Sequence, residues 1–177
     1  PQFGRHLPPA LTKLSVYASR RTTVPAIFEH LPESLCDLTL YLNHESTIFL
    51  ECLPRNLTSL SLHLFVTCLP GQLANLPRGL KIFLAPQLSL SIAEDVADLP
   101  RSLHTLELDE IELSSMLHHL PPALTSFKLG IILDTNINDI KTLSASLPHL
   151  KVFNIDNYIE WEDPAFTKLQ AYFLDSA

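Results

Sequence analysis

The sequence predicts an α/β solenoid, in which a parallel β-sheet lines the concave face and short α- or 3₁₀-helices line the convex face. Three observations predict this fold. The motif Leu-Pro-x-x-Leu-x-x-Leu-x-Leu, seen most clearly at 99–108, recurs along the chain at intervals of 21 to 26 residues, which is typical of stacked repeat proteins. Within each copy, Leu-x-Leu alternates apolar and polar positions as a half-buried strand does. Such a short unit cannot bury its apolar edge alone, so neighbouring units share one core.

The copies align when each is numbered from the first leucine of Leu-x-x-Leu-x-Leu, its anchor. The anchors are Leu11, Leu35, Leu57, Leu80, Leu103, Leu124 and Leu150. The fourth position is apolar in every copy: Leu14, Leu38, Leu60, Phe83, Leu106, Phe127 and Phe153. The sixth is apolar too: Val16, Leu40, Leu62, Ala85, Leu108, Leu129 and Ile155. These two columns predict the buried side of seven strands, and a degenerate unit at 169–174 brings the expected number of repeats to seven or eight.

A Leu-Pro pair precedes each anchor and predicts where the preceding helix ends, because a residue before proline is pushed out of the helical region. One short helix is expected in each unit. The expected ranges are Val24–Glu29, Ser46–Glu51, Thr67–Asn75, Ser91–Glu94, Ser114–His119, Asn138–Ser146 and a last helix opening at Asp163. Ser91 and Glu94 have the spacing of a capping box, and Asp163 precedes a proline suited to a first helical turn.

The repeated motif resembles the leucine-rich repeat family, and the resemblance covers nearly the whole chain. Its Leu-Pro form is similar to the LPX-type repeats of bacterial effectors and to repeats of F-box and FNIP-type proteins. The family usually carries asparagine at the ninth position, where its amide binds turn backbone. Here that column is largely apolar: Ser19, Asn43, Phe65, Leu88, Ile111, Ile132 and Tyr158. The core is therefore expected to be closed by apolar side chains rather than by an asparagine ladder.

Composition narrows the classes of partner. The chain of 177 residues has a formal net charge of −7, which argues against nucleic acid or an anionic membrane surface as the main partner. No apolar run approaches the ~20 residues of a membrane span. Three cysteines without a clustered framework suit a reducing compartment, so a cytoplasmic location is expected. We expect residues 1–177 to form one domain, and to be a fragment lacking one or both caps because the chain opens part-way through a repeat.

Outward-facing columns carry the candidate binding residues, because stacking brings residues of successive units to within ~5 Å. Tyr17, Tyr41 and His63 share the seventh position of the first three units. Exposed amphipathic rings in a row are typical of a contact surface. The alternative is that aromatic residues simply suit strands and cover the sheet.

The middle and later units provide two further candidate patches. Ile82 and Leu84, followed by Pro86, form an apolar patch on the exposed face, which indicates a partner or a covering segment. This prediction depends on the strand register, because a shift of one residue would turn Ala85 to the exposed face and Ile82 and Leu84 to the core. The later units carry charged candidates that fit a basic peptide or a cation, or else a solvated, solubilising face: Glu107, Asp109, Glu110, Lys128 and Asp156.

Metal and enzyme chemistry find little support. His6, His30 and Cys52 occupy one column and are zinc-type ligand residues, but polar side chains that bind loop backbone explain the column equally well. No closely spaced ligand pair accompanies them, so we expect no metal and no cofactor. The sequence holds no nucleophile-elbow, phosphate-loop, dinucleotide-binding or HExxH motif.

The function expected from the resemblance is a non-catalytic module that presents its concave face to a protein or peptide, in a context such as substrate recognition for ubiquitination. Two alternatives stay open. The chain could be the repeat region of an effector ubiquitin ligase whose catalytic domain lies outside this sequence. It could also be a structural spacer without a specific ligand. The oligomeric state is not predicted.

Overall fold

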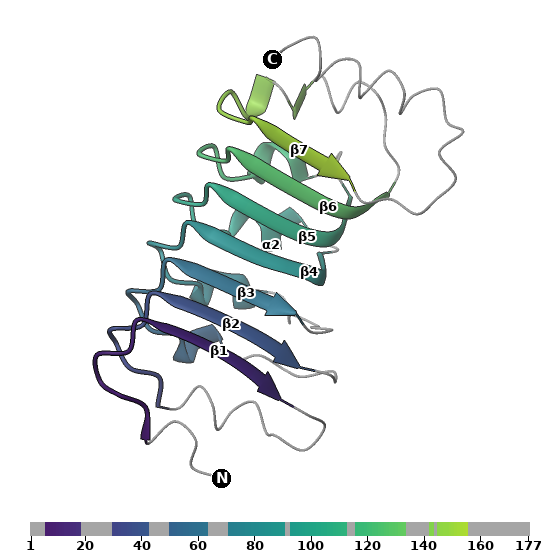
Figure 1. Cartoon of the computed structure of the whole chain (residues 1–177). Coiled ribbons are helices and arrows are strands. Elements are labelled where there is room, and N and C mark those ends of the chain that lie inside the picture. Colours follow the sequence, from purple (N-terminus) through teal and green to yellow (C-terminus); the bar gives the residue numbers. More distant parts are fainter. Residues whose placement is uncertain are drawn as a thin grey trace.

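A computed structural model describes residues 6–18, 30–42, 50–63, 71–90, 93–112, 116–133, 142–143 and 145–155. Within these ranges the chain forms one seven-stranded sheet whose strands follow sequence order, with every neighbouring pair parallel (Figure 1). The strands are β1 (Lys13–Ala18), β2 (Asp37–Leu42), β3 (Ser59–His63), β4 (Ile82–Leu90), β5 (Thr105–Glu112), β6 (Ser126–Leu133) and β7 (Val152–Ile155). The expected parallel sheet of an α/β protein is confirmed.

The strands pair in the register that the leucine columns predict. Leu38 lies opposite both Leu14 and Leu60, and Phe83 lies between Leu60 and Leu106 in the same row. The side chains of Leu38, Leu60, Phe83 and Leu106 are fully buried. Since successive side chains alternate across a sheet, the third, fifth and seventh positions face the opposite side.

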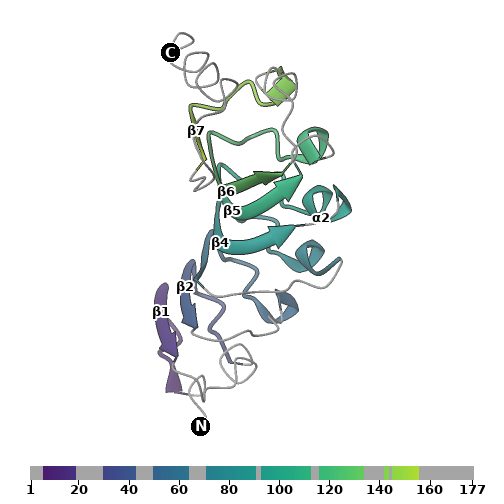
Figure 2. The same cartoon turned by 90° about the vertical axis from the view of Figure 1, so that its right-hand side faces the viewer.

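Short helical segments cover only the face onto which the fourth and sixth positions point. They include η2 (Leu50–Cys52), η3 (Gln72–Asn75), α2 (Ala93–Ala97) and η4 (Leu117–His119). Consecutive segments contact one another, and the view along the sheet shows them on one side of it (Figure 2). No helix of the described ranges lies on the other side, which we call the open face. None of these helices is long and apolar enough to cross a membrane.

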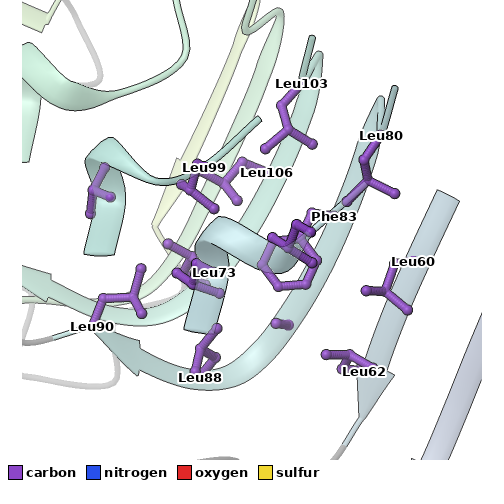
Figure 3. Packing of buried hydrophobic residues seen from close by; sticks show 14 of the residues in the cluster. Leu60, Leu62, Leu73, Leu80, Phe83, Leu88, Leu90, Leu99, Leu103 and Leu106 are labelled. Carbon is purple, nitrogen blue, oxygen red and sulfur yellow. The ribbon is translucent and has the colours of Figure 1, made fainter. Parts of the chain in front are cut away.

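The core is one continuous layer between the sheet and the helical segments. Figure 3 shows Leu60, Phe83 and Leu106 pointing from three successive strands into this layer, with Leu73 of η3 facing them. Burying one leucine or phenylalanine side chain contributes about 1.5–3 kcal/mol relative to exposing it. Ala85 is also buried, so the predicted register of β4 is correct and the slipped register is excluded.

Each Leu-Pro pair makes the turn that leads into a strand. The N–H of the anchor leucine donates to the carbonyl of the proline three residues earlier, at 3.0–3.2 Å, in the first six units. In the seventh unit, where proline stands one residue closer, the carbonyl of Leu147 accepts the bond from Leu150 instead. The leucines before Pro77 and Pro121 adopt ψ of 140° and 144°, and so end η3 and η4 as the steric rule for a residue before proline requires.

Neighbouring units are tied at the start of their strands. The carbonyl of Thr58, for example, accepts hydrogen bonds from the N–H groups of both Lys81 and Ile82, at 2.8 and 3.1 Å. The residue before the anchor adds a side-chain tie in some units. The hydroxyl of Ser102 lies 2.6 Å from the carbonyl oxygen of Arg78 and 2.7 Å from that of Leu80. Ser34 makes the equivalent pair of contacts with the first unit.

The expected helices of the middle units are helical in most of their described residues, but some bounds differ. Of the expected Ser114–His119, Met116 is α-helical and η4 continues to His119, and of the expected Thr67–Asn75 the described helical part is η3. The helix expected at Ser91–Glu94 extends to Ala97 in α2, and residues 142–143 and 145–146, within the expected Asn138–Ser146, are helical. The predicted helices Val24–Glu29 and the one opening at Asp163 lie outside the described residues, as do Ser91 and the side chain of Glu94 in the expected capping box.

One column prediction is wrong. Numbering each unit from its anchor aligned Leu88 with Ile111, but the structure pairs Leu90 with Ile111 and Ser89 with Glu110. Between Ala85 and Ser89 the strand β4 accommodates two more residues than β5 does, so the pairing is irregular there. A bulge of this kind lets both Leu88 and Leu90 reach the core, where each is buried.

Candidate functional site

The first three strands place Tyr17, Tyr41 and His63 in a stack on the open face, which we call the aromatic ladder. The Tyr17 and Tyr41 ring centroids are 4.4 Å apart with planes 3° apart, and those of Tyr41 and His63 are 4.4 Å apart at 5°. The strand register brings the three residues side by side, because they are direct cross-strand partners. The sequence predicts this shared column but not the parallel stacking of the rings, in which Tyr17 is 75% exposed.

Next to the ladder, the fifth position of the same strands carries small hydroxyl side chains: Ser15, Thr39 and Ser61. Ser61 is 6% exposed, and its Oγ lies 2.9 Å from Nε2 of His63. This contact holds the imidazole ring against Tyr41. It was not predicted, although Ser-x-His on one strand puts both side chains on the same face.

On the far side of the hydroxyl row, Lys13 and Asp37 form an ion pair, with Nζ and Oδ2 3.2 Å apart. The Lys13 side chain is 80% exposed, so the pair contributes at most ~1 kcal/mol to stability. Because the two charges cancel, this edge of the open face presents no net charge to a partner. The first three strands thus present a rigid aromatic row, small hydroxyls and a neutral ion pair.

Two of the three apolar candidates lie on the open face as predicted. Ile82 is 38% exposed and Leu84 is half-buried there, and Pro86 is half-buried as well. Ile82 lies opposite Ser59 and Leu84 opposite Ser61, so the apolar patch continues directly from the hydroxyl row. The irregular pairing of β4 begins after Ala85, where the apolar patch ends, and Pro86 belongs to this irregular segment.

The structure brings together some of the charged candidates. Lys128 Nζ lies 3.1 Å from Glu107 Oε1, since the two residues are cross-strand partners. The Asp109 carboxylate is half-buried beside Gly130, where an added Cβ would come within 2.5 Å of Asp109 Oδ1. The Gly130 backbone therefore gives this carboxylate its space, a role that was not predicted. Glu110 is described only as backbone, and Asp156 lies outside the described residues.

The described ranges hold few arrangements suited to metal binding or catalysis. Throughout the described residues, no three His, Cys, Asp or Glu side chains gather closely enough to hold a metal ion, and this includes the column of His6, His30 and Cys52. The buried carboxylate of Asp95 accepts a hydrogen bond from the N–H of Gly71 at 3.1 Å on the helical side of the sheet. The Ser61–His63 contact has no carboxylate on the other ring nitrogen within the described part of the chain.

The arrangement therefore suits recognition by an extended surface. A rigid aromatic row, an apolar patch and charged groups follow one another across the open face. No protein-family model matches the chain, and no curated protein is similar to it at a significant level.

Proposed function

We propose that the chain is a solenoid of leucine-rich-repeat type that binds a protein or peptide partner through its open face and performs no catalysis. The repeated Leu-Pro turns, the one strand per unit and the one-sided helical layer support the solenoid assignment. The same features leave a broad sheet surface available for contact.

One observation carries the binding proposal. The aromatic ladder stands on the face that no described helix covers, and its outermost ring, Tyr17, is 75% exposed. Tyrosine combines a large apolar ring with a hydroxyl, and loses little conformational freedom when a partner covers it. The stacking of Tyr17 on Tyr41 reduces that loss further, because the rings are already ordered in the free protein.

The apolar patch favours a partner that also covers β4. Ile82 and Leu84 adjoin the hydroxyl row, so a partner lying across the strands contacts aromatic and aliphatic side chains in sequence. We further propose an intracellular setting. It is supported by the free thiols of Cys36 and Cys52, whereas Cys68 lies outside the described residues.

A selection of linear peptides displayed on phage tests the proposal. Peptides enriched on the wild-type chain are synthesised with a fluorescent label, and their Kd is measured by anisotropy. We expect the triple variant Tyr17→Ala/Tyr41→Ala/His63→Ala to bind them at least about tenfold more weakly, which corresponds to about 1.4 kcal/mol.

A control variant with Glu51→Ala and Asn75→Ala carries exposed substitutions on the helical side and is expected to bind as the wild type does. Circular dichroism and urea unfolding verify that the variants are folded. Equal affinity of the triple variant and the control, or failure of the wild type to enrich any peptide, would refute the proposal.

A further inference from the structure

The Leu-Pro turns carry a group of cations that the open face does not use. Arg55, Arg78 and Arg101 each follow the proline of their unit, in three consecutive units, and all three are exposed. Lys81 is exposed on the middle turn beside them. We call these four residues the basic turn cluster; it lies at the edge where strands β3, β4 and β5 begin, on the left of the sheet in Figure 1.

The backbone that carries the cluster is held rigidly. Each turn is closed by its proline carbonyl and anchor N–H, and the turns are tied to one another through the hydrogen bonds that Thr58 and Lys81 accept from the next unit. Ser102 Oγ binds the carbonyl oxygen of Arg78 itself, at 2.6 Å. Neighbouring turns are therefore about one strand spacing apart, ~4.8 Å, so the three arginines begin within ~10 Å of one another.

The positive charge is not neutralised within the described ranges. The ion pairs of Lys13 with Asp37 and of Lys128 with Glu107 lie on the open face, and neither involves a residue of the basic turn cluster. The turns of the third, fourth and fifth units, 54–58, 77–81 and 100–104, contain no Asp or Glu. Glu33 occupies the position of Arg55 on the preceding turn but makes no ion pair with it.

Like charges at this spacing repel one another, and an anion between them removes the repulsion. Guanidinium groups bind carboxylates in a two-pronged geometry, which favours them at such sites. We propose that the basic turn cluster binds an acidic segment of a protein partner, with clustered Asp or Glu side chains. This edge is separate from the aromatic ladder, and the inference does not rest on the function proposed for the open face.

The charge of the whole chain favours a peptide over other polyanions. A net charge of −7 repels a long polyanion such as a nucleic acid or an anionic membrane surface, whereas a short acidic segment experiences mainly the local cations. The ~10 Å span of the cluster suits a few residues of extended chain, at ~3.3 Å per residue.

The test uses the full chain and a labelled linear peptide of alternating Glu and Gly, with the Gln–Gly peptide as its neutral counterpart. We expect the acidic peptide alone to bind, more weakly as salt is raised. The variant Arg78→Gln/Arg101→Gln is expected to lose at least about tenfold in affinity. The control Lys13→Gln/Lys151→Gln removes the same charge elsewhere and is expected to stay within about twofold of the wild type.

Two more measurements make the test specific. Glu33→Gln removes a carboxylate from the turn that precedes the cluster, so the acidic peptide should bind this variant more tightly than it binds the wild type. The aromatic-ladder triple variant should bind the acidic peptide as the wild type does, which separates this inference from the proposed function. The inference is overturned if the two double variants bind equally, if the acidic peptide does not bind at low salt, or if an oligonucleotide or anionic vesicles bind more tightly than the peptide.

Discussion

Gly79 stands where other units place a hydroxyl that ties them to their neighbour, and replacing it with serine should stabilise the protein. Ser102 and Ser34 occupy the equivalent position and lie within 2.6–2.8 Å of two carbonyl oxygens of the preceding unit. By the repeat, the acceptors for Gly79→Ser are the carbonyls of Arg55 and Leu57. A Cβ at Gly79 meets nothing within 4 Å, so the serine side chain has room.

The magnitude follows from two contributions. A new hydrogen bond of this kind contributes about 0.5–1.5 kcal/mol net. Replacing glycine where the backbone is compatible contributes about 0.4–1 kcal/mol by restricting the unfolded chain. The free energy of unfolding should therefore rise by about 1–2.5 kcal/mol, and Tm by roughly 2–4 °C for each kcal/mol in a chain of this size.

Urea unfolding followed by far-UV circular dichroism measures the change, with Gly79→Ala as the matched control. The alanine variant gains only the backbone contribution of about 0.4–1 kcal/mol. Conversely, Ser102→Ala should lose about 0.5–1.5 kcal/mol. If Gly79→Ser is no more stable than Gly79→Ala, the hydroxyl does not tie the units and the reasoning from Ser102 is wrong.

Three further predictions concern the core and the open face. Phe83→Ala should destabilise the protein by about 3–5 kcal/mol in urea unfolding, because the ring is fully buried; a loss below about 1 kcal/mol would place Phe83 outside the core. Gly130→Ala should lower the free energy of unfolding by about 1–3 kcal/mol, because the new Cβ clashes with Asp109. Adding Asp109→Ala should relieve only part of this loss, because the carbonyl oxygen of residue 109 would still lie 2.8 Å from the new Cβ. Fully additive effects of the two changes would contradict the contact. A double-mutant cycle on Tyr17→Ala and Tyr41→Ala should give a coupling of about 0.5–1.5 kcal/mol, whereas zero coupling would mean that the rings do not stack.

The sequence predicts the register because burial leaves little choice. A strand shifted by one residue would expose Leu38 or Leu60 and bury the polar residues beside it, so the leucine columns define which side chains face each way. The aromatic ladder follows from the same columns. Even β4, with the small Ala85 in a core position, keeps the predicted register, since Phe83 and Leu80 are both buried beside it.

Other features depend on interactions that a period does not encode. Numbering from the anchor leucines does not show where a unit holds its extra residues, and Leu88 and Leu90 are both apolar, so either could fill the ninth column of β4. The Ser61–His63 contact and the space that Gly130 leaves for Asp109 depend on side-chain positions across strands. The basic turn cluster was visible in the sequence as arginine after proline in three units, but that column is exposed and carries no hydrophobic signal.

Site-specific disulfide formation between β3 and β4 tests most directly that successive units stack in register. The cysteine pairs are introduced into a variant in which Cys36, Cys52 and Cys68 have been replaced. Ser59→Cys and Ile82→Cys lie on the open face as direct cross-strand partners, about one strand spacing apart, which a disulfide can bridge. We expect this pair to oxidise readily while Ser59→Cys and Lys81→Cys stay reduced. Cross-linking of the second pair in preference to the first would contradict the register, and with it the separation of a buried face from an open one.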